Sequence, residues 1–338
     1  MRDYPIQSLR VVNFRSIIDE IFKFRPLTIF TGKNGSGKST VLNALLLCAS
    51  FRNVGETNDP NIDYDGNFTL NQDEIKIYLN DENSVLCKRE KSPISQSCQT
   101  QRQFHFEQDF YYLNANRSPI ESMKLIANTK LKFGAGGEFV EQYFLNNHRQ
   151  KISNFNKLDI ETLDYHIGFW INKILDLQFN FTAQENQQRI QCGFNSKELK
   201  VNIDPTRIAT GMNYLTKILI VGLACKKGDV FIVENPEIHL HPKAISNLAE
   251  FFAMLVKGGV QVVLETHDTR LVSKIRILIH KKDLLSSDAV IYYKDSVESE
   301  FIPVFINDNG FFTDDKEQRI PFPQGFMDVD LPELMEVR

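Results

Sequence analysis

The sequence predicts an α/β fold built around a parallel β-sheet. Between residues 229 and 293, strand-like and helical patterns alternate in the order "DVFIVE", "PKAISNLAEFFAMLV", "VQVVLETH", "TRLVSKIRILI" and "AVIYY". Such alternation builds a parallel sheet covered by helices. Nearer the N-terminus, the apolar strand "LTIF" leads into a glycine-rich turn and an apolar helix. With 338 residues and 42% hydrophobic content, the chain can bury the large core that such a sheet requires.

The first part of the chain is expected to form a strand, a loop, a helix and then an antiparallel β-lobe. Residues 7–12 and 26–31 are rich in β-branched and aromatic residues, which favours strands, and a helix is expected from about Ser39 to Ala49. The polar segment 51–66 predicts a loop. "EIKIYL" and "VLCKRE" alternate apolar and polar residues around "NDENS", which predicts a hairpin, and "FHF" and "FYYLNA" are expected to continue this lobe.

A mainly helical insertion is expected next. Apolar residues recur at steps of three and four, as in an amphipathic helix, at Ile160, Leu163, Ile167, Trp170, Ile171 and Ile174. Strand-like "FNFTA", "RIQCGF" and "ELKVNI" follow, and then the helix "MNYLTKILIVGLA". We therefore expect one domain over 1–338, with a core segment at 1–50, a β-rich lobe at 51–120, an insertion at 121–205 and the rest of the sheet at 206–338.

Composition excludes several classes of protein. No apolar run approaches a membrane span and the N-terminus lacks the apolar centre of a signal peptide, so we expect a cytoplasmic protein. The five cysteines are odd in number and lack CxxC spacing, so neither a disulfide framework nor a zinc site is indicated. The net charge of −4 gives no overall attraction to nucleic acid.

The glycine-rich turn predicts a nucleotide site. "TGKNGSGKST", residues 31–40, fits the pattern GxxxxGK[ST], whose backbone N–H groups cradle phosphate oxygens at the start of a helix. In this interpretation Lys38 reaches the β- and γ-phosphates of ATP and Ser39 ligates Mg²⁺. The predicted nucleotide-binding residues of the loop are Gly32, Lys33, Asn34, Gly35, Ser36, Gly37, Lys38, Ser39 and Thr40.

Two later strand ends supply candidates for the rest of the site. Four apolar residues precede Glu234 in "VFIVENPEIHLHP", which is the Walker B arrangement of an acid that holds Mg²⁺ at the carboxyl end of a sheet. The apolar strand "VVLETHD" ends at His267, which we expect to face the γ-phosphate and to sense it or hold the attacking water.

In this order, "NFRS", "GKNGSGKST", "YYLNANRS", "ATGMNYL", "ENPEIHLHP" and "ETHD" resemble the motifs of ABC-type ATPase heads of the RecF, SMC and OLD kind. The chain is most similar to stand-alone bacterial AAA-type ATPases, whose terminal PxGFFD-like motif resembles "PFPQGFMDVD" with Met327 at the second Phe. The resemblance implies an ABC-ATPase head with a P-loop parallel sheet core, an N-terminal antiparallel β-lobe and a helical insertion. It also implies ATP held between two heads in a homodimer.

The resemblance assigns further residues, some with departures from the family pattern. Gly211 and Asn213 match the signature segment that touches the partner head's nucleotide, with Asn213 in place of the usual Ser, and Arg117 matches an arginine near the nucleotide. Asn235 stands where most such sites have the Glu that polarises water. Two alternatives follow: hydrolysis is slow and ATP mainly holds the dimer, or Glu237 supplies the carboxylate.

The leading functional hypothesis is an ATP-driven switch that acts on a separate effector, a nuclease or toxin, in bacterial anti-phage defence. The alternative is a RecF-like ATPase that binds DNA directly in repair or maintenance. Its support is a helix after His267 with basic residues Arg270, Lys274, Arg276, Lys281 and Lys282. A transporter ATPase subunit is a third hypothesis, which the altered signature segment disfavours; no membrane partner is expected.

Overall fold

The computed structural model describes residues 4–50, 74–81, 83–88, 99–100, 104–121, 123–126, 131–152, 161–196 and 198–323. The predicted loop at 51–66 lies outside these residues, as does most of the terminal motif, including Met327. Among the described helices, none combines the length and the apolar character that crossing a bilayer would require.

A seven-stranded sheet forms the centre of the molecule, and it confirms the predicted α/β class. Its strand order is β18-β17-β16-β3-β15-β14-β7. The parallel members are β7 (Phe110–Leu113), β14 (Val230–Glu234), β15 (Gln261–Glu265), β3 (Leu27–Gly32) and β16 (Ala289–Lys294). Two strands, β17 (Ile302–Ile306) and β18 (Phe312–Thr313), extend one edge in antiparallel pairing. The sheet places the carboxyl ends of β3, β15 and β14 side by side.

A second, antiparallel sheet forms the predicted N-terminal β-lobe. Its order is β2-β1-β4-β5-β6. The strands are β1 (Ser8–Phe14), β2 (Ile17–Lys23), β4 (Glu74–Leu79), β5 (Asn83–Lys88) and β6 (Gln99–Thr100). The β4–β5 hairpin was expected, whereas β2 was not, and the lobe begins at residue 8 instead of 51.

The strand β7 corrects one expectation about this lobe. "FYYL" does not continue the antiparallel sheet but pairs in parallel with β14 at the edge of the central sheet. All four of its residues are buried. A short run that is apolar throughout is typical of a parallel strand covered on both faces, and this pattern outweighs its sequence position next to the lobe.

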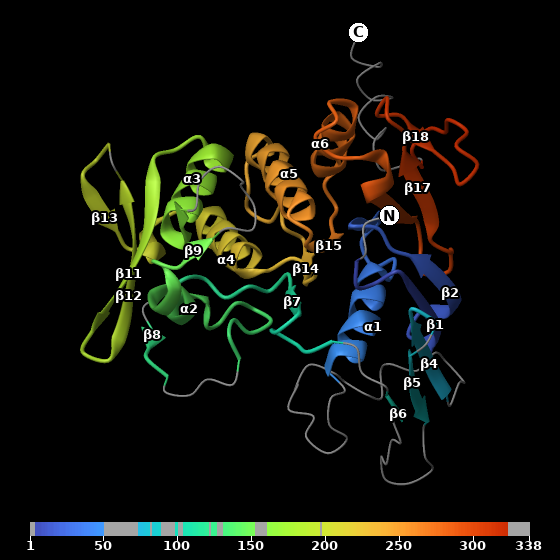
Figure 1. Ribbon diagram of the computed structural model, residues 1–338, viewed down its shortest axis with the longest axis horizontal. Helices are drawn as coiled ribbons and strands as arrows, with labels where there is room; N and C mark the ends of the chain where they lie inside the picture. Colours follow the sequence, from blue (N-terminus) through green and yellow to red (C-terminus); the bar gives the residue numbers. More distant parts are fainter. Residues whose placement is uncertain are drawn as a thin grey trace.

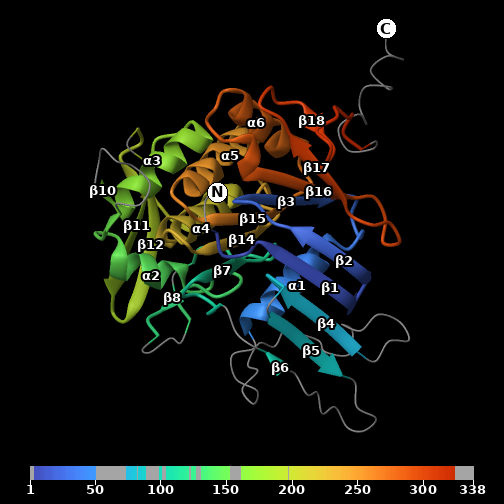
Figure 2. The same cartoon turned by 45° about the vertical axis from the view of Figure 1, so that its right-hand side comes forward.

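The helix α1 (Lys38–Ser50) lies between the two sheets (Figures 1 and 2). Its side chains Val41, Leu42 and Leu45 are fully buried and share a core with strand residues such as Phe14 of the lobe and Phe30 of the central sheet. Burying such an apolar helix on both sides fixes the position of its N-terminus, which follows the glycine-rich loop.

The opposite face of the central sheet is covered by helices. Here α4 (Thr210–Ala224), α5 (Pro242–Lys257) and α6 (Thr269–His280) pack in a second core with sheet residues such as Phe231 and Leu264 (Figure 1). The predicted insertion helix is α3 (Leu163–Leu175), whose stripe of Leu163, Ile167, Trp170, Ile171 and Ile174 is buried as expected; Ile160 is outside the described residues.

The rest of the insertion surrounds α3. It contains α2 (Val140–Asn147) and a sheet of β11 (Phe179–Asn186), β12 (Arg189–Ser196) and β13 (Val201–Ile203), with β8 (Met123–Lys124) paired to β12. The short strands β9 (Lys151–Ile152) and β10 (Glu161–Thr162) pair with each other. The predicted strands "FNFTA", "RIQCGF" and "ELKVNI" therefore build one antiparallel sheet.

Candidate functional site

The glycine-rich loop joins β3 to α1, as the motif predicted. Gly32 has φ of 137°, and a Cβ at this position would lie only 1.9 Å from the carbonyl oxygen of Lys294. The Lys33 N–H donates to the same oxygen at 3.2 Å. Only glycine fits this close approach to the end of β16, so the beginning of the loop is fixed by the neighbouring strand.

Lys38 lies inside the loop. Its ammonium donates to the carbonyl oxygens of Gly32 at 3.1 Å and Lys33 at 2.6 Å. The side chain is buried, and burial lowers the pKa of the ammonium while the charge of Glu265 opposes this shift. The loop therefore holds a positive charge at the helix N-terminus, where both the charge and the helix dipole favour a phosphate group.

Ser39, the predicted Mg²⁺ ligand, contacts a residue that the sequence analysis did not identify. Its hydroxyl donates to Oε1 of Glu265 at 3.0 Å. Glu265 is the last residue of β15, and only 4% of its surface is exposed. Burial raises the pKa of the Glu265 carboxyl to about 7, and the Glu234 charge adds to this effect, against the Ser39 hydrogen bond and the Lys38 charge. The missed signal was a second apolar strand that ends in Glu.

Glu234, the predicted Walker B acid, is the last residue of β14 and pairs in register with Glu265. Its Oε1 accepts a hydrogen bond from the Tyr112 hydroxyl at 2.7 Å, and its Oε2 accepts one from the Ala115 N–H at 3.1 Å. Both donors come from β7 and the residues just after it. The two carboxylates thus lie on adjacent strands but have different neighbours.

Arg117 lies behind the strand end. Its guanidinium donates to the carbonyl oxygens of Asn114 at 2.9 Å, Glu234 at 2.8 Å and Asn235 at 2.8 Å. The residue is only 2% exposed, and burial lowers the pKa of the guanidinium to about 10. In this arrangement Arg117 braces the backbone on which Glu234 sits. Its predicted role beside a nucleotide stays a prediction.

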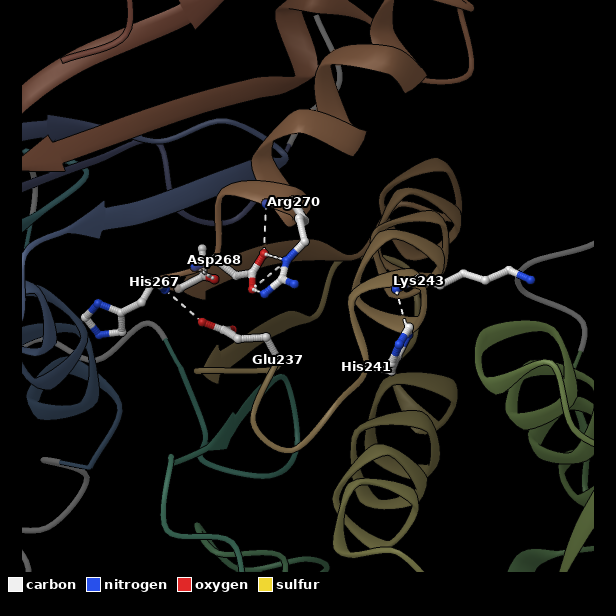
Figure 3. A network of polar contacts seen from close by, with 7 residues as sticks. Glu237, His241, Lys243, His267, Asp268 and Arg270 are labelled. Atoms are coloured by element: carbon white, nitrogen blue, oxygen red, sulfur yellow. Dashed lines mark hydrogen bonds and ion pairs between the residues drawn. The ribbon is translucent and has the colours of Figure 1, made fainter. Parts of the chain in front are cut away.

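Glu237 and His267 lie close together where β14 and β15 end (Figure 3), and Asn235 directly follows β14. Asn235 has φ of 42°, and its N–H donates to the Glu265 carbonyl at 2.7 Å. Oε1 of Glu237 accepts from the backbone N–H of His267 at 2.8 Å, and burial raises the pKa of the Glu237 carboxyl. The His267 imidazole points away from Glu237, toward the loop, with Nδ1 3.2 Å from the Gly32 carbonyl oxygen. Burial, followed by the Lys38 charge, lowers the pKa of this imidazole.

The predicted signature residues are buried at the start of α4. A Cβ on Gly211 would lie 2.3 Å from the carbonyl oxygen of His239, so glycine permits the "HLHP" segment to cross this helix closely. The amide of Asn213 is buried and donates to the Pro205 carbonyl at 2.9 Å. Nearby, His241 caps α5 by accepting from the Lys243 N–H (Figure 3). Contact of Gly211 and Asn213 with a second head stays a prediction.

The donor set fits Mg²⁺ bound together with a nucleotide. Within the described ranges, no three His, Cys, Asp or Glu side chains are grouped so that they could hold a metal ion by themselves. Nucleotide sites bind Mg²⁺ through one or two protein oxygens, with phosphates and water as the other ligands. Ser39, Glu234 and Glu265 offer such oxygens, and Oε2 of Glu265 is buried without a hydrogen-bond partner among the described residues.

Comparisons with known proteins agree with this reading. The family described as "AAA domain, putative AbiEii toxin, Type IV TA system" matches residues 56–273. The protein named Old nuclease from Escherichia phage P2 is 24% identical over 157 residues, which cover 42% of this chain. The match covers 26% of the phage protein, so the chain spans about a quarter of the length of this relative.

Solved structures of SMC heads share the fold. An Smc head domain with an extended coiled coil bound to the C-terminal domain of ScpA, derived from Pyrococcus furiosus, has a TM-score of 0.54 at 11% identity, covering 89% of this chain and 96% of that one. An SmcHead bound to the C-winged helix domain of ScpA has a TM-score of 0.51 at 12% identity, covering 90% and 98%. At these identities the likeness concerns the fold alone.

Proposed function

Since this chain belongs to the family described as "AAA domain, putative AbiEii toxin, Type IV TA system" and has the fold of an ABC-type ATPase head of the RecF, SMC and OLD kind, we propose that it is an ATP-driven switch. Two copies close on two Mg-ATP, hydrolyse them slowly, and pass the movement to a separate effector protein. The observation that carries the proposal is the convergence of Lys38, Ser39 and two carboxylates at one edge of the central sheet.

Each residue of the site has a role in this proposal. The loop N–H groups and the Lys38 ammonium bind the phosphates, and Ser39 and Glu234 hold the metal. When bound, Mg²⁺ neutralises charge on the terminal phosphates and polarises them toward attack. Glu237 and His267 orient water and sense the γ-phosphate. The His267 N–H donates to Glu237, and the His267 imidazole lies beside the Gly32 carbonyl oxygen of the phosphate loop, which supports this assignment.

The names of the similar proteins support the proposed class of effector. The phage relative is named a nuclease. The SMC heads are named as bound to parts of ScpA, so heads of this fold can carry a partner protein. We therefore propose a nuclease or toxin partner, with anti-phage defence as the setting.

The basic residues of α6 give little support to the alternative of direct DNA binding. Lys274 forms an ion pair with Glu250 at 2.6 Å, and Arg270 is bonded to Asp268. Arg276 donates to the Gly310 carbonyl at 2.8 Å and lies over the Phe312 ring. Basic side chains already engaged within the chain have less charge to offer to a phosphate backbone. Lys281 and Lys282 remain exposed at the end of the helix.

The test of the switch is nucleotide-dependent association. Light scattering of the wild-type chain should show ATP with Mg²⁺ raising the dimer fraction, because nucleotide in the interface adds contacts. Lys38→Ala is the matched control, since it removes the ammonium group that binds the phosphates and should leave the chain in its nucleotide-free state. An unchanged molar mass of the wild type across the titration, with ATP demonstrably bound, would refute the dimer.

A further inference from the structure

We infer that Glu265 is a direct ligand of the nucleotide's Mg²⁺, in the position next to Ser39, so that the metal site has a second acidic residue besides Glu234. The inference rests on the proposed function, because the metal arrives with the nucleotide. It assigns a role to a buried carboxylate that the phosphate-loop and Walker B motifs do not include.

The distance between the two side chains matches the geometry of the ion. Mg²⁺ demands near-octahedral coordination with bonds of about 2.0–2.1 Å, so two adjacent ligand oxygens are separated by about √2 times that length, roughly 2.8–3.0 Å. Ser39 Oγ and Glu265 Oε1 are 3.0 Å apart. The two oxygens can therefore occupy one edge of the octahedron without moving, once the serine proton points elsewhere.

Burial and charge at this edge favour a cation. Glu265 is 4% exposed, and its Oε2 has no hydrogen-bond partner within the described chain. The charges of Glu234 and Glu237 both repel that of Glu265, while Lys38 attracts it. A desolvated carboxylate that two like charges repel is costly to keep ionised, and a divalent cation bound to it lowers that cost.

The backbone holds Glu265 in place on both sides. The Asn235 N–H donates to the Glu265 carbonyl at 2.7 Å, and the Thr266 N–H donates to the Phe30 carbonyl of β3 at 3.0 Å. The carboxylate therefore starts from a fixed strand end beside the phosphate loop. Glu234, by contrast, already accepts one hydrogen bond on each oxygen from Tyr112 and Ala115. A fixed ligand next to Ser39 is preorganised for the metal.

The experiment measures metal binding directly, with Mn²⁺ as a paramagnetic substitute for Mg²⁺ and a slowly hydrolysed ATP analogue. Glu265→Gln should weaken Mn²⁺ binding in the ternary complex by at least about 10-fold, because loss of even an outer-shell partner of a metal ligand typically costs 10- to 100-fold. The affinity for the analogue without metal should stay within about 3-fold, because Lys38 and the loop N–H groups are intact. Glu265→Asp keeps the charge but moves the carboxylate back toward the strand. Its Mn²⁺ affinity should lie between those of the wild type and Glu265→Gln.

Glu107→Gln is the matched control, because Glu107 is another Glu that is 4% exposed, bonded instead to the N–H groups of Phe133 and Gly134. It should lower stability and leave Mn²⁺ affinity unchanged. Mn²⁺ affinity within 2-fold of wild type in both Glu265 variants would overturn the inference while leaving the proposed function standing. Failure of the wild type to bind the analogue at all would instead refute the nucleotide site itself.

Discussion

The carboxyl ends of β14 and β15 have almost the same local sequence and quite different surroundings. Each strand is a short apolar run that ends in Glu, "VFIVE" and "QVVLE", and the two acids pair in register. Glu234 is held by Tyr112 and Ala115, whereas Glu265 is held by Ser39 of the phosphate loop. The comparison teaches that a strand-terminal acid acquires its role from the strand next to it, and not from the motif in which it stands.

Strand order explains the difference. In the central sheet β15 lies between β3 and β14, so its last residue is next to the strand that carries the phosphate loop. Glu234 lies one strand further away and faces β7 on its other side. In parallel sheets, ligands bind outside the carboxyl ends of the strands, and here two neighbouring strand ends share that position.

The largest effect is expected when the charge of Lys38, which attracts Glu265 at the end of β15, is removed. Lys38→Ala should abolish tight ATP binding and reduce turnover to background, because the ammonium is the point charge that meets the terminal phosphates. Equilibrium binding of a fluorescent ATP analogue checks the first result, and phosphate release checks the second. Near-normal turnover in this variant would contradict the assignment of the loop and, with it, the distinction between the two strand ends.

A smaller effect is expected at the residue that links the two strand ends. Glu237 follows β14 but accepts a hydrogen bond from the His267 N–H after β15. We expect Glu237→Gln to lower single-turnover hydrolysis by about 10²-fold with ATP binding intact, since a positioned general base is typically worth 10²- to 10⁴-fold.

Asn235→Glu tests the competing explanation in the same assay. If Glu237 already supplies the carboxylate, a new acid at position 235 should change turnover by no more than about 3-fold. A rise of about 10²-fold would instead mean that the wild-type site lacks a base and that ATP mainly holds the dimer. Should both variants behave as wild type, His267 would be the next group to test.

Sequence alone predicted the parts of the fold and of the site that depend on local patterns. The phosphate loop, the strand before Glu234 and the stripe of α3 each rest on spacing within a few residues, and the fold confirms the arrangement of strand, loop and helix. Glu265 was not identified from the sequence because its importance depends on which strand lies beside β15. Strand order is set by packing between distant segments. The assignment of "FYYL" to the lobe was wrong for the same reason.

Arg117 illustrates a second limit of sequence reasoning. An arginine at the end of a strand is usually a surface charge, and the motif marked it as a neighbour of the nucleotide. The structure buries it against three backbone carbonyls, where it braces the turn after β14. A buried guanidinium needs hydrogen-bond partners, and two of those carbonyls, from Glu234 and Asn235, come from a distant segment that no local pattern reveals.

The smallest effect is expected from the anchor of Glu234. Tyr112→Phe removes the hydroxyl that donates to Oε1 of Glu234 at 2.7 Å, a hydrogen bond to a charged group worth about 1.5–3 kcal/mol. Denaturant unfolding should report a loss within that range. The Mg²⁺ concentration for half-maximal ATPase should rise by less than about 5-fold, because the Ala115 N–H still holds the other oxygen and Ser39 and Glu265 are untouched. If Tyr112→Phe instead raises this Mg²⁺ concentration as much as Glu265→Gln does, the end of β14 dominates the metal site, and the contrast between the two strands disappears.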